Sequence, residues 1–357
     1  MSNLALLNAR GEGVPRNDQA AYALYQRAAE GGYGPGLETI GTYYEFGTLL
    51  AKDPVKARAM YIAAGEAGWS GGMRRAGRVL ELGVGGEIDY AAALAWYRRA
   101  ADAGDAASLE LLGDMYDYGR GVPVNYAEAL SWYQKAAAGG SGSALRRLGE
   151  HAYYGRGVPP DHRAAFDLYL KAAKQDDASA MYSVGYLYKH GQGVTKNFDK
   201  AKEWLTKAAE RDVVAAMEHL GSLFEEWRKF PEAAEWYRKA ADHDNSFALA
   251  RLGIFYLDGK GVERDERQAL ALLQKAAAQR NSEALERLGM MYEAGIAVPQ
   301  DFIKAAEFYR NSASLNTTPD IEDVGLISAR EASLYSRAAS SGRLEDPRTL
   351  GLLQPLR

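Results

Sequence analysis

The segment 144–173, ALRRLGEHAYYGRGVPPDHRAAFDLYLKAA, contains the pattern that decides the fold. Its first half has a small residue, Ala144, followed by two leucines and Gly149, and its second half has an alanine at Ala165. A glycine-rich turn separates the two halves. At 100° per residue the apolar positions of the first half share one side of a helix. The segment therefore predicts two amphipathic helices joined by a short loop.

This pattern recurs with a period of 36 residues. Marker glycines are 36 residues apart except between Gly221 and Gly253, where the spacing is 32. An alanine follows each marker glycine by 16 residues, except for Ala233, which comes four residues early. A fixed period of this length is typical of solenoid proteins. The nine predicted helix pairs are marked by Ala5, Gly41, Gly77, Gly113, Gly149, Gly185, Gly221, Gly253 and Gly289.

Turn and capping residues recur with the same period. A glycine six residues after the marker is expected to end the first helix in a left-handed conformation. These glycines are Gly47, Gly83, Gly119, Gly155, Gly191, Gly259 and Gly295. The second helix is expected to begin at an N-cap, which contributes about 1 kcal/mol. The predicted N-caps are Asn17, Asp53, Asp89, Asn125, Asp161, Asn197, Asp265 and Asp301.

The second helices are expected to supply the core. Each places its alanine beside a large residue, for example Trp96 or Trp132. We predict both columns, the alanines and these large residues, to be buried. The short repeat is the exception to the capping pattern, since Lys229 precedes Pro231 there.

The motifs Ala-Leu-Arg-Arg-Leu-Gly149, Tyr154-Gly-Arg-Gly-Val158 and Tyr169-Leu-Lys-Ala-Ala173 resemble the Sel1-like repeat, a relative of the tetratricopeptide repeat. The resemblance covers most of the chain. It implies a right-handed superhelix with a concave groove lined by the first helices, and adaptor, scaffold or inhibitor roles. The predicted fold is all-α, a right-handed α/α solenoid of about nine helix-turn-helix repeats plus a C-terminal helix. The predicted domains are the repeat solenoid, 1–315, and a C-terminal capping helix and tail, 316–357.

Composition argues against several functional classes. The net charge is −4 and the basic residues form no run, which disfavours nucleic acid and anionic membranes as partners. The absence of cysteine removes disulfides and thiolate chemistry. The five histidines occupy unrelated repeat positions, and the Gly-x-Gly-Val loops lack the strand and Lys-Ser/Thr of a phosphate loop. We therefore expect no metal, no cofactor and no enzymatic activity.

The start of the chain has no basic segment and only a four-residue apolar run, and no later stretch is long enough to span a bilayer. The sequence as written thus predicts a cytoplasmic protein. A periplasmic location is the expectation if an upstream signal peptide has been removed.

Function is expected at the arc of the first helices that the repeat leaves free. This arc is charged in early repeats, aromatic and mixed in the middle, and apolar late, at Ala250, Ile254, Leu257, Met290 and Ala294. The early charges are interpreted as a solvated face, and the late apolar zone needs a cover from the tail or from a partner. Tyrosine and arginine are common at binding hot spots. The predicted partner-binding residues are Tyr118, Arg146, Glu150, Tyr153, Tyr154, Tyr182, Tyr186, Lys189 and His190.

The leading hypothesis is a non-catalytic module that binds a partner protein in its groove. The resemblance extends to bacterial immunity proteins, which implies an inhibitor of a secreted effector. The alternative is a periplasmic or envelope assembly or signalling adaptor, and an enzyme is a third class. The neighbouring gene would discriminate best among them, because effector and immunity proteins are encoded together.

Overall fold

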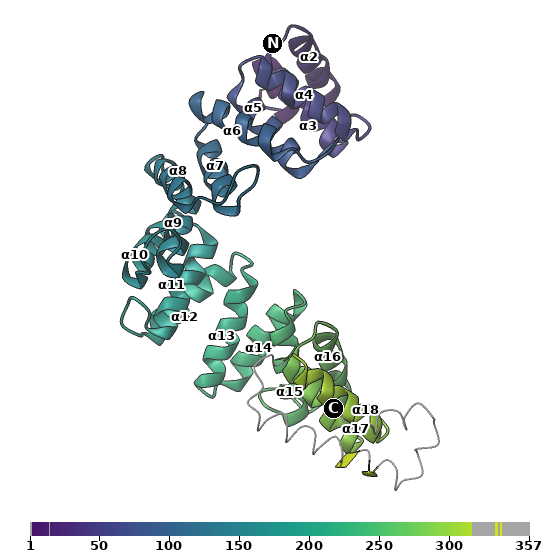
Figure 1. Ribbon diagram of the computed structural model, residues 1–357. Coiled ribbons are helices and arrows are strands. Elements are labelled where there is room, and N and C mark those ends of the chain that lie inside the picture. Colours follow the sequence, from purple (N-terminus) through teal and green to yellow (C-terminus); the bar gives the residue numbers. More distant parts are fainter. Residues whose placement is uncertain (1, 14, 316–332, 335, 338–357) are drawn as a thin grey trace, which may run out of the picture. The chain divides into compact units, whose positions relative to one another are not determined.

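The structure is a computed structural model that describes residues 2–13, 15–315, 333–334 and 336–337 (Figure 1). These residues contain 18 helices and no strand, which confirms the predicted all-α helical repeat. The first ten helices are α1 Ser2–Arg10, α2 Asp18–Glu30, α3 Gly34–Phe46, α4 Pro54–Glu66, α5 Ser70–Leu82, α6 Tyr90–Asp102, α7 Ala106–Tyr118, α8 Tyr126–Ala138, α9 Gly142–Tyr154 and α10 His162–Ala173. The others are α11 Ala178–His190, α12 Phe198–Ala209, α13 Val214–Glu226, α14 Phe230–Asp242, α15 Ser246–Asp258, α16 Glu266–Ala278, α17 Ser282–Ala294 and α18 Phe302–Ala313.

The chain forms two compact units. The first comprises residues 1–180 and 192–194, and the second comprises 181–191 and 195–357. Within each unit a helix packs mainly against its neighbours in sequence: α3 against α4 and α4 against α5 in the first, α13 against α14 and α14 against α15 in the second. Each unit therefore has the nearest-neighbour packing of a repeat protein.

The predicted helix ends are confirmed. The seven glycines expected to end first helices have φ between 66° and 74°, a left-handed conformation that glycine adopts without strain. All eight predicted N-caps accept a backbone N–H through their side chains; Asn125 Oδ1, for example, accepts from Glu128 N at 3.1 Å. Lys229 provides no such bond, as its place in the short repeat suggested.

The core of each repeat is built around a contact between the marker glycine and a side chain of the second helix. A Cβ added to Gly113 would lie 2.4 Å from Cε1 of Tyr133, so the ring rests directly on the backbone of α7. The same contact joins Gly77 to Tyr97 in the first unit and Gly221 to Tyr237 in the second. The marker is glycine because any side chain would occupy the space that the ring fills.

The large residues that the sequence analysis placed in the core, such as Trp96 and Trp132, are not the side chains that fill the space at the marker glycine. The prediction that these tryptophans are buried was wrong. The fully buried side chain is the next residue along the helix, as with Tyr97 and Tyr133, which are both 0% exposed. Trp96 and Trp132 are half-buried, and each lies beneath a basic side chain three residues later. Adjacent residues differ by 100° around a helix, so both border the apolar side, and only the facing glycine selects between them. The alanine column is buried as predicted.

The buried tyrosines place their hydroxyls against carboxylates of the preceding first helix. Tyr97 Oη donates to Glu81 at 2.7 Å, and Tyr133 Oη donates to Asp114 at 2.7 Å. In the second unit Tyr237 Oη donates to Glu225 at 2.8 Å. Burial and the nearby carboxylate both raise the pKa of these phenols, so the tyrosines stay neutral donors.

Two of the four described residues of the predicted tail, Leu334 and Arg337, contact the last helix pair. Leu334 is 1% exposed and packs with Phe302, Ala306 and Tyr309 of α18, and Met290 borders this cluster. Arg337 donates to Glu293 at 3.0 Å. The rest of the C-terminal helix and tail predicted over 316–357 falls outside the described residues. The 315/316 domain boundary stays a prediction.

The glycine contact gives a test of the core. Gly113→Ala is expected to lower the free energy of unfolding by roughly 1–3 kcal/mol, because the new methyl group collides with the Tyr133 ring. The matched control is Gly31→Ala, since Gly31 has φ −81° and its nearest neighbour would be 3.5 Å from the new Cβ. Urea denaturation measures both. Equal stability of the two variants would show that the ring contact does not constrain the repeat.

Candidate functional site

Ion pairs connect successive first helices at a fixed repeat position. At three junctions the arginine two residues before the marker glycine, Arg75, Arg147 or Arg251, reaches a carboxylate of the preceding first helix. Arg75 Nε lies 3.5 Å from Glu38 Oε1, and Arg147 Nη2 lies 3.4 Å from Asp114 Oδ1. These groups are half-buried. The charges of the arc thus hold repeats together, and the interpretation of the early ones as an ordinary solvated face was wrong.

At one junction of the second unit, rings replace this ion pair. His219 of α13 occupies the arginine position, and the imidazole lies 5.5 Å from the rings of both Tyr182 and Tyr186 in α11. Tyr186 also lies 4.3 Å from the ring of His190. We name these four residues the α11–α13 aromatic cluster. The tyrosines occupy the repeat positions of Glu38 and Asp114, so both sides of the usual contact have changed together.

Exposure within this cluster is partial. Tyr182, Tyr186 and His219 are half-buried, and His190 is exposed. The tyrosines therefore both contact the next repeat and present part of their rings outward. The sequence analysis missed His219, because its role appears only when two first helices are placed side by side.

Lys189 differs from the expectation. Its side chain is buried, with Nζ donating to Ser222 Oγ at 2.6 Å and lying 3.0 Å from Glu226 Oε1. The ammonium group therefore ties α11 to α13 and does not present a charge to a partner.

The α11–α13 aromatic cluster is uncharged near neutral pH. Burial, together with the positive charge of Lys189 and the neighbouring His190, lowers the pKa of His219 to about 4. The pKa of His190 is also lowered, by burial and by Lys189. The cluster thus offers aromatic surface without net charge where other junctions hold ion pairs.

The predicted residues of the first unit form a separate group on α7 and α9. Arg146 binds Glu150 in its own helix and lies 3.3 Å from Asp177. Arg147 Nη1 donates to the hydroxyl of Tyr118 at 2.9 Å, and Tyr118 is 45% exposed. Arg146 and Glu150, both predicted to bind a partner, are paired with each other.

Tyr153 and Tyr154 have different surroundings. Tyr153 is half-buried; its ring stacks on His162 at 4.7 Å and its hydroxyl donates to Gln192 at 2.8 Å. Tyr154 is 62% exposed, with the guanidinium of Arg156 5.1 Å from its ring centre. Tyr154 is therefore the more accessible of the two.

The first unit also contains a buried imidazole–carboxylate pair that the sequence did not reveal. His151 Nε2 lies 3.3 Å from Asp117 Oδ1, and Nδ1 lies 2.8 Å from the carbonyl oxygen of Arg156. Burial lowers the pKa of His151, but the bonds to Asp117 and to that carbonyl raise it by more, so the pKa is raised overall. The pair is 1% and 6% exposed, which makes it a structural element rather than a reactive one.

The apolar late zone is more buried than the sequence suggested. Ala250 and Ile254 are buried, Leu257 and Met290 are half-buried, and only Ala294 is exposed. Most of this zone is therefore not available as a binding surface.

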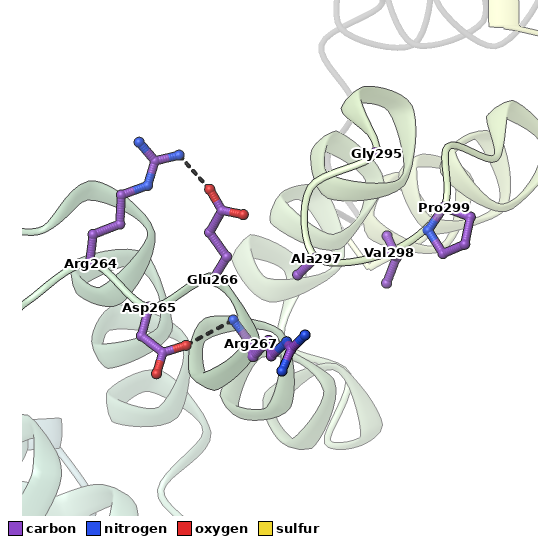
Figure 2. A pocket seen from close by; sticks show the side chains of 8 residues that line it. All are labelled: Arg264, Asp265, Glu266, Arg267, Gly295, Ala297, Val298 and Pro299. Carbon is purple, nitrogen blue, oxygen red and sulfur yellow. Dashed lines mark hydrogen bonds and ion pairs between the residues drawn. The ribbon is translucent and has the colours of Figure 1, made fainter.

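A surface pocket of the second unit lies where the start of α16 faces the α17–α18 loop (Figure 2). Arg264 pairs with Glu266 at 2.6 Å, and Asp265 caps α16 by accepting from Arg267 N at 3.0 Å (Figure 2). These polar groups serve local structure. Within the described part of the chain, no group of three histidine, aspartate or glutamate side chains could hold a metal ion. None of the described helices combines the length and apolar composition needed to cross a membrane.

His219 and His151 are expected to give the free energy of unfolding opposite dependences on pH. The folded state lowers the pKa of His219 from 6.5 to about 4, so between these values it excludes a proton that the unfolded chain binds. The free energy of unfolding should therefore fall as the pH falls from 6.5 toward 4, and His219→Asn should reduce this fall. Denaturation at several pH values measures it. His243→Asn, at an exposed position of the same unit, is the control, and identical pH profiles for the two variants would contradict the prediction.

His151 should show the reverse dependence. Its folded pKa lies above 6.5, so its contribution to stability is fully present below 6.5 and is lost as the pH rises through the folded pKa. His151→Asn should therefore lose most stability, relative to the parent, in acid. The same denaturation series measures this, and a difference that grows with pH would disprove the ion pair.

Solved structures of other proteins share this fold. The structure of c5321, a protective antigen present in uropathogenic Escherichia coli strains, is 28% identical, with a TM-score of 0.73 over 100% of this chain and 79% of that one. A Sel1 repeat protein from Oxalobacter formigenes is also 28% identical, with a TM-score of 0.62 over 86% and 89%. An immunity protein, Pa5087 of Pseudomonas aeruginosa, is 18% identical, with a TM-score of 0.41 over 60% of this chain and 82% of that one. No curated protein matches the chain.

The repeats themselves give the family. The model of the Sel1 repeat matches nine segments: 1–33, 40–69, 70–105, 106–141, 142–177, 178–213, 228–245, 246–281 and 282–317. These segments include α14, the second helix of the short repeat, and leave only 34–39 and 214–227 unmatched before residue 318. The chain therefore belongs to the Sel1 repeat family.

Proposed function

We propose that this chain is a non-catalytic scaffold that binds a partner protein on the arc of its first helices, as an inhibitor or immunity protein for a secreted bacterial effector. Sel1 repeats support the coarser part of this proposal, a protein–protein interaction scaffold. The observation that carries the choice of surface is the α11–α13 aromatic cluster, which replaces an ion pair that the repeat uses elsewhere.

Aromatic rings at this position favour binding for a physical reason. An arginine–carboxylate pair at a repeat junction is satisfied internally, so a partner gains little by covering it. Partly exposed tyrosines still have apolar area to bury, and they lose little conformational entropy when they do so. The neutral histidines of the cluster also avoid the cost of desolvating a charge.

The remaining polar groups of the arc support a scaffold rather than a catalyst. Arg251 binds Glu225 and lies 2.8 Å from Glu283, and Arg146 and Glu150 bind each other. Groups held in such contacts are poorly placed to exchange protons with a substrate.

The test uses the product of the adjacent gene as the candidate partner. Co-expression should give a complex that purifies intact, and the chain should protect cells from the toxicity of that product. Tyr182→Ala with Tyr186→Ala should weaken the complex by about 30-fold or more, equivalent to roughly 2 kcal/mol, because the anchoring rings are lost. Titration calorimetry of the purified proteins measures the change.

Because Tyr182 and Tyr186 also touch His219, the control must break a similar junction. Arg251→Ala removes the equivalent inter-repeat contact of α15 and should lower the melting temperature without weakening the complex. If both variants lose affinity in proportion to their stability, the tyrosines are structural and the proposed surface is wrong. If the adjacent gene product neither binds nor is toxic, the immunity role is wrong.

A further inference from the structure

A second candidate surface lies at the ends of the first helices of the first unit. The last residue of α3, α5, α7 and α9 is a large apolar side chain in each case. These four residues, named here the terminal ridge, are exposed: Phe46 62%, Leu82 56%, Tyr118 45% and Tyr154 62%. The sequence analysis included only the two tyrosines.

A second apolar row lies next to the terminal ridge. Each ridge residue precedes a left-handed glycine, and the residue before the following N-cap packs on that glycine. A Cβ on Gly83 would lie 2.9 Å from Ile88, and one on Gly119 would lie 2.8 Å from Val124. Ile88 is 55% exposed and Val124 is 52% exposed, and Pro160 takes the same place beside Gly155. Beside Gly47 the corresponding residue is Lys52, so the two columns expose apolar atoms side by side at the ends of α5, α7 and α9.

The second unit shows that the fold does not need these apolar residues. Its first helices end at His190, Glu226, Asp258 and Ala294. Its residues against the corresponding glycines are Lys196, Arg264 and Gln300. The same backbone is therefore built without a large apolar residue in either column. Exposed apolar residues usually mark a contact surface when they contribute little to packing and lie together along one edge.

The charge at one end of the ridge indicates what kind of partner would fit. Arg120 lies 5.1 Å and Arg147 lies 5.7 Å from the ring centre of Tyr118, and Arg156 lies 5.1 Å from that of Tyr154. Glu81, on the last turn of α5, is buried and binds both Tyr97 and Arg120, and Asp117, on the last turn of α7, is buried beside His151. The available positive charge at this end is therefore that of the exposed Arg156, next to the exposed ring of Tyr154.

We propose that the terminal ridge binds an acidic amphipathic segment of a partner protein, an inference that rests on the protein-binding function proposed above. Neighbouring first helices such as α3 and α5 are in contact, which places helix axes about 8–10 Å apart. The segment would carry apolar anchors at about that interval, with a carboxylate facing Arg156. The guanidinium of Arg156 over the Tyr154 ring suits such a ligand, because this arginine can leave the ring for a carboxylate at little cost.

A membrane surface fits less well. The residues that follow the second row are exposed N-cap carboxylates, Asp89 and Asp161, which an anionic bilayer would repel. A protein segment can avoid these fixed charges by its own side-chain pattern, whereas a lipid surface cannot.

The experiment selects ligands from a displayed library of random 16-residue peptides with the full chain as bait. Enriched peptides should combine aliphatic or aromatic anchors with aspartate or glutamate. For a synthetic copy of the most enriched peptide, Leu82→Glu should weaken binding at least 10-fold, because it places a charge in the centre of the ridge. Arg156→Glu should weaken binding and reduce its salt dependence. Fluorescence anisotropy measures each affinity.

Ala294→Glu is the matched control, since it introduces the same charge at the same exposed repeat position of the second unit. It should leave peptide affinity unchanged, and equal losses in Ala294→Glu and Leu82→Glu would overturn the proposal. Peptide binding should survive Tyr182→Ala with Tyr186→Ala, so failure of the α11–α13 aromatic cluster and failure of the ridge are separable. Binding of the parent, but not of Leu82→Glu, to phosphatidylserine vesicles in place of peptides would overturn the proposal in favour of a membrane.

Discussion

The contact between a marker glycine and the ring of the following second helix is the constraint on which the rest of the structure depends. The ring of Tyr133 rests on the α7 backbone because Gly113 has no side chain, and the two helices can then approach closely. Close approach buries the alanine column of the second helix, which leaves no room for larger residues there. Where a leucine replaces the tyrosine, as at Leu205 against Gly185, the glycine is still required because the leucine fills the same space.

The buried ring in turn determines the polar surface. A buried phenol needs an acceptor, and the preceding first helix supplies a carboxylate, as Glu81 does for Tyr97. At the α13–α15 junction the same acceptor, Glu225, also binds Arg251 of the next repeat. Core packing, hydroxyl bonding and repeat stacking are thus linked through a few carboxylates. A junction without them, such as that between α11 and α13, has to be held by other contacts, here the rings and Lys189.

Because of this link, binding surfaces are expected where the chain departs from the repeat pattern. Most arc residues are engaged in contacts between repeats, so their side chains are already committed. The α11–α13 aromatic cluster and the terminal ridge are two places where the chain departs from its own pattern and leaves aromatic or apolar area exposed. The histidines illustrate the same distinction, since Asp117 raises the pKa of His151 within the core, whereas the pKa of His219 among the rings is lowered to about 4.

The sequence by itself determined the helix pairs, their number, the capping residues and the family, because each depends on periodic spacing and on local backbone chemistry. Asn125 caps its helix and Gly119 adopts a left-handed φ for reasons contained within a few residues. The sequence also placed Tyr118 and Tyr154 among exposed residues correctly. Only the tertiary structure decided which of two adjacent large residues is core, since Trp132 and Tyr133 both border the apolar side and the facing glycine selects the tyrosine. The tertiary structure alone showed that Lys189 is buried and that His219 contacts the tyrosines of α11. Both facts depend on side chains from helices more than 20 residues apart in sequence, and helical periodicity carries no information over that distance.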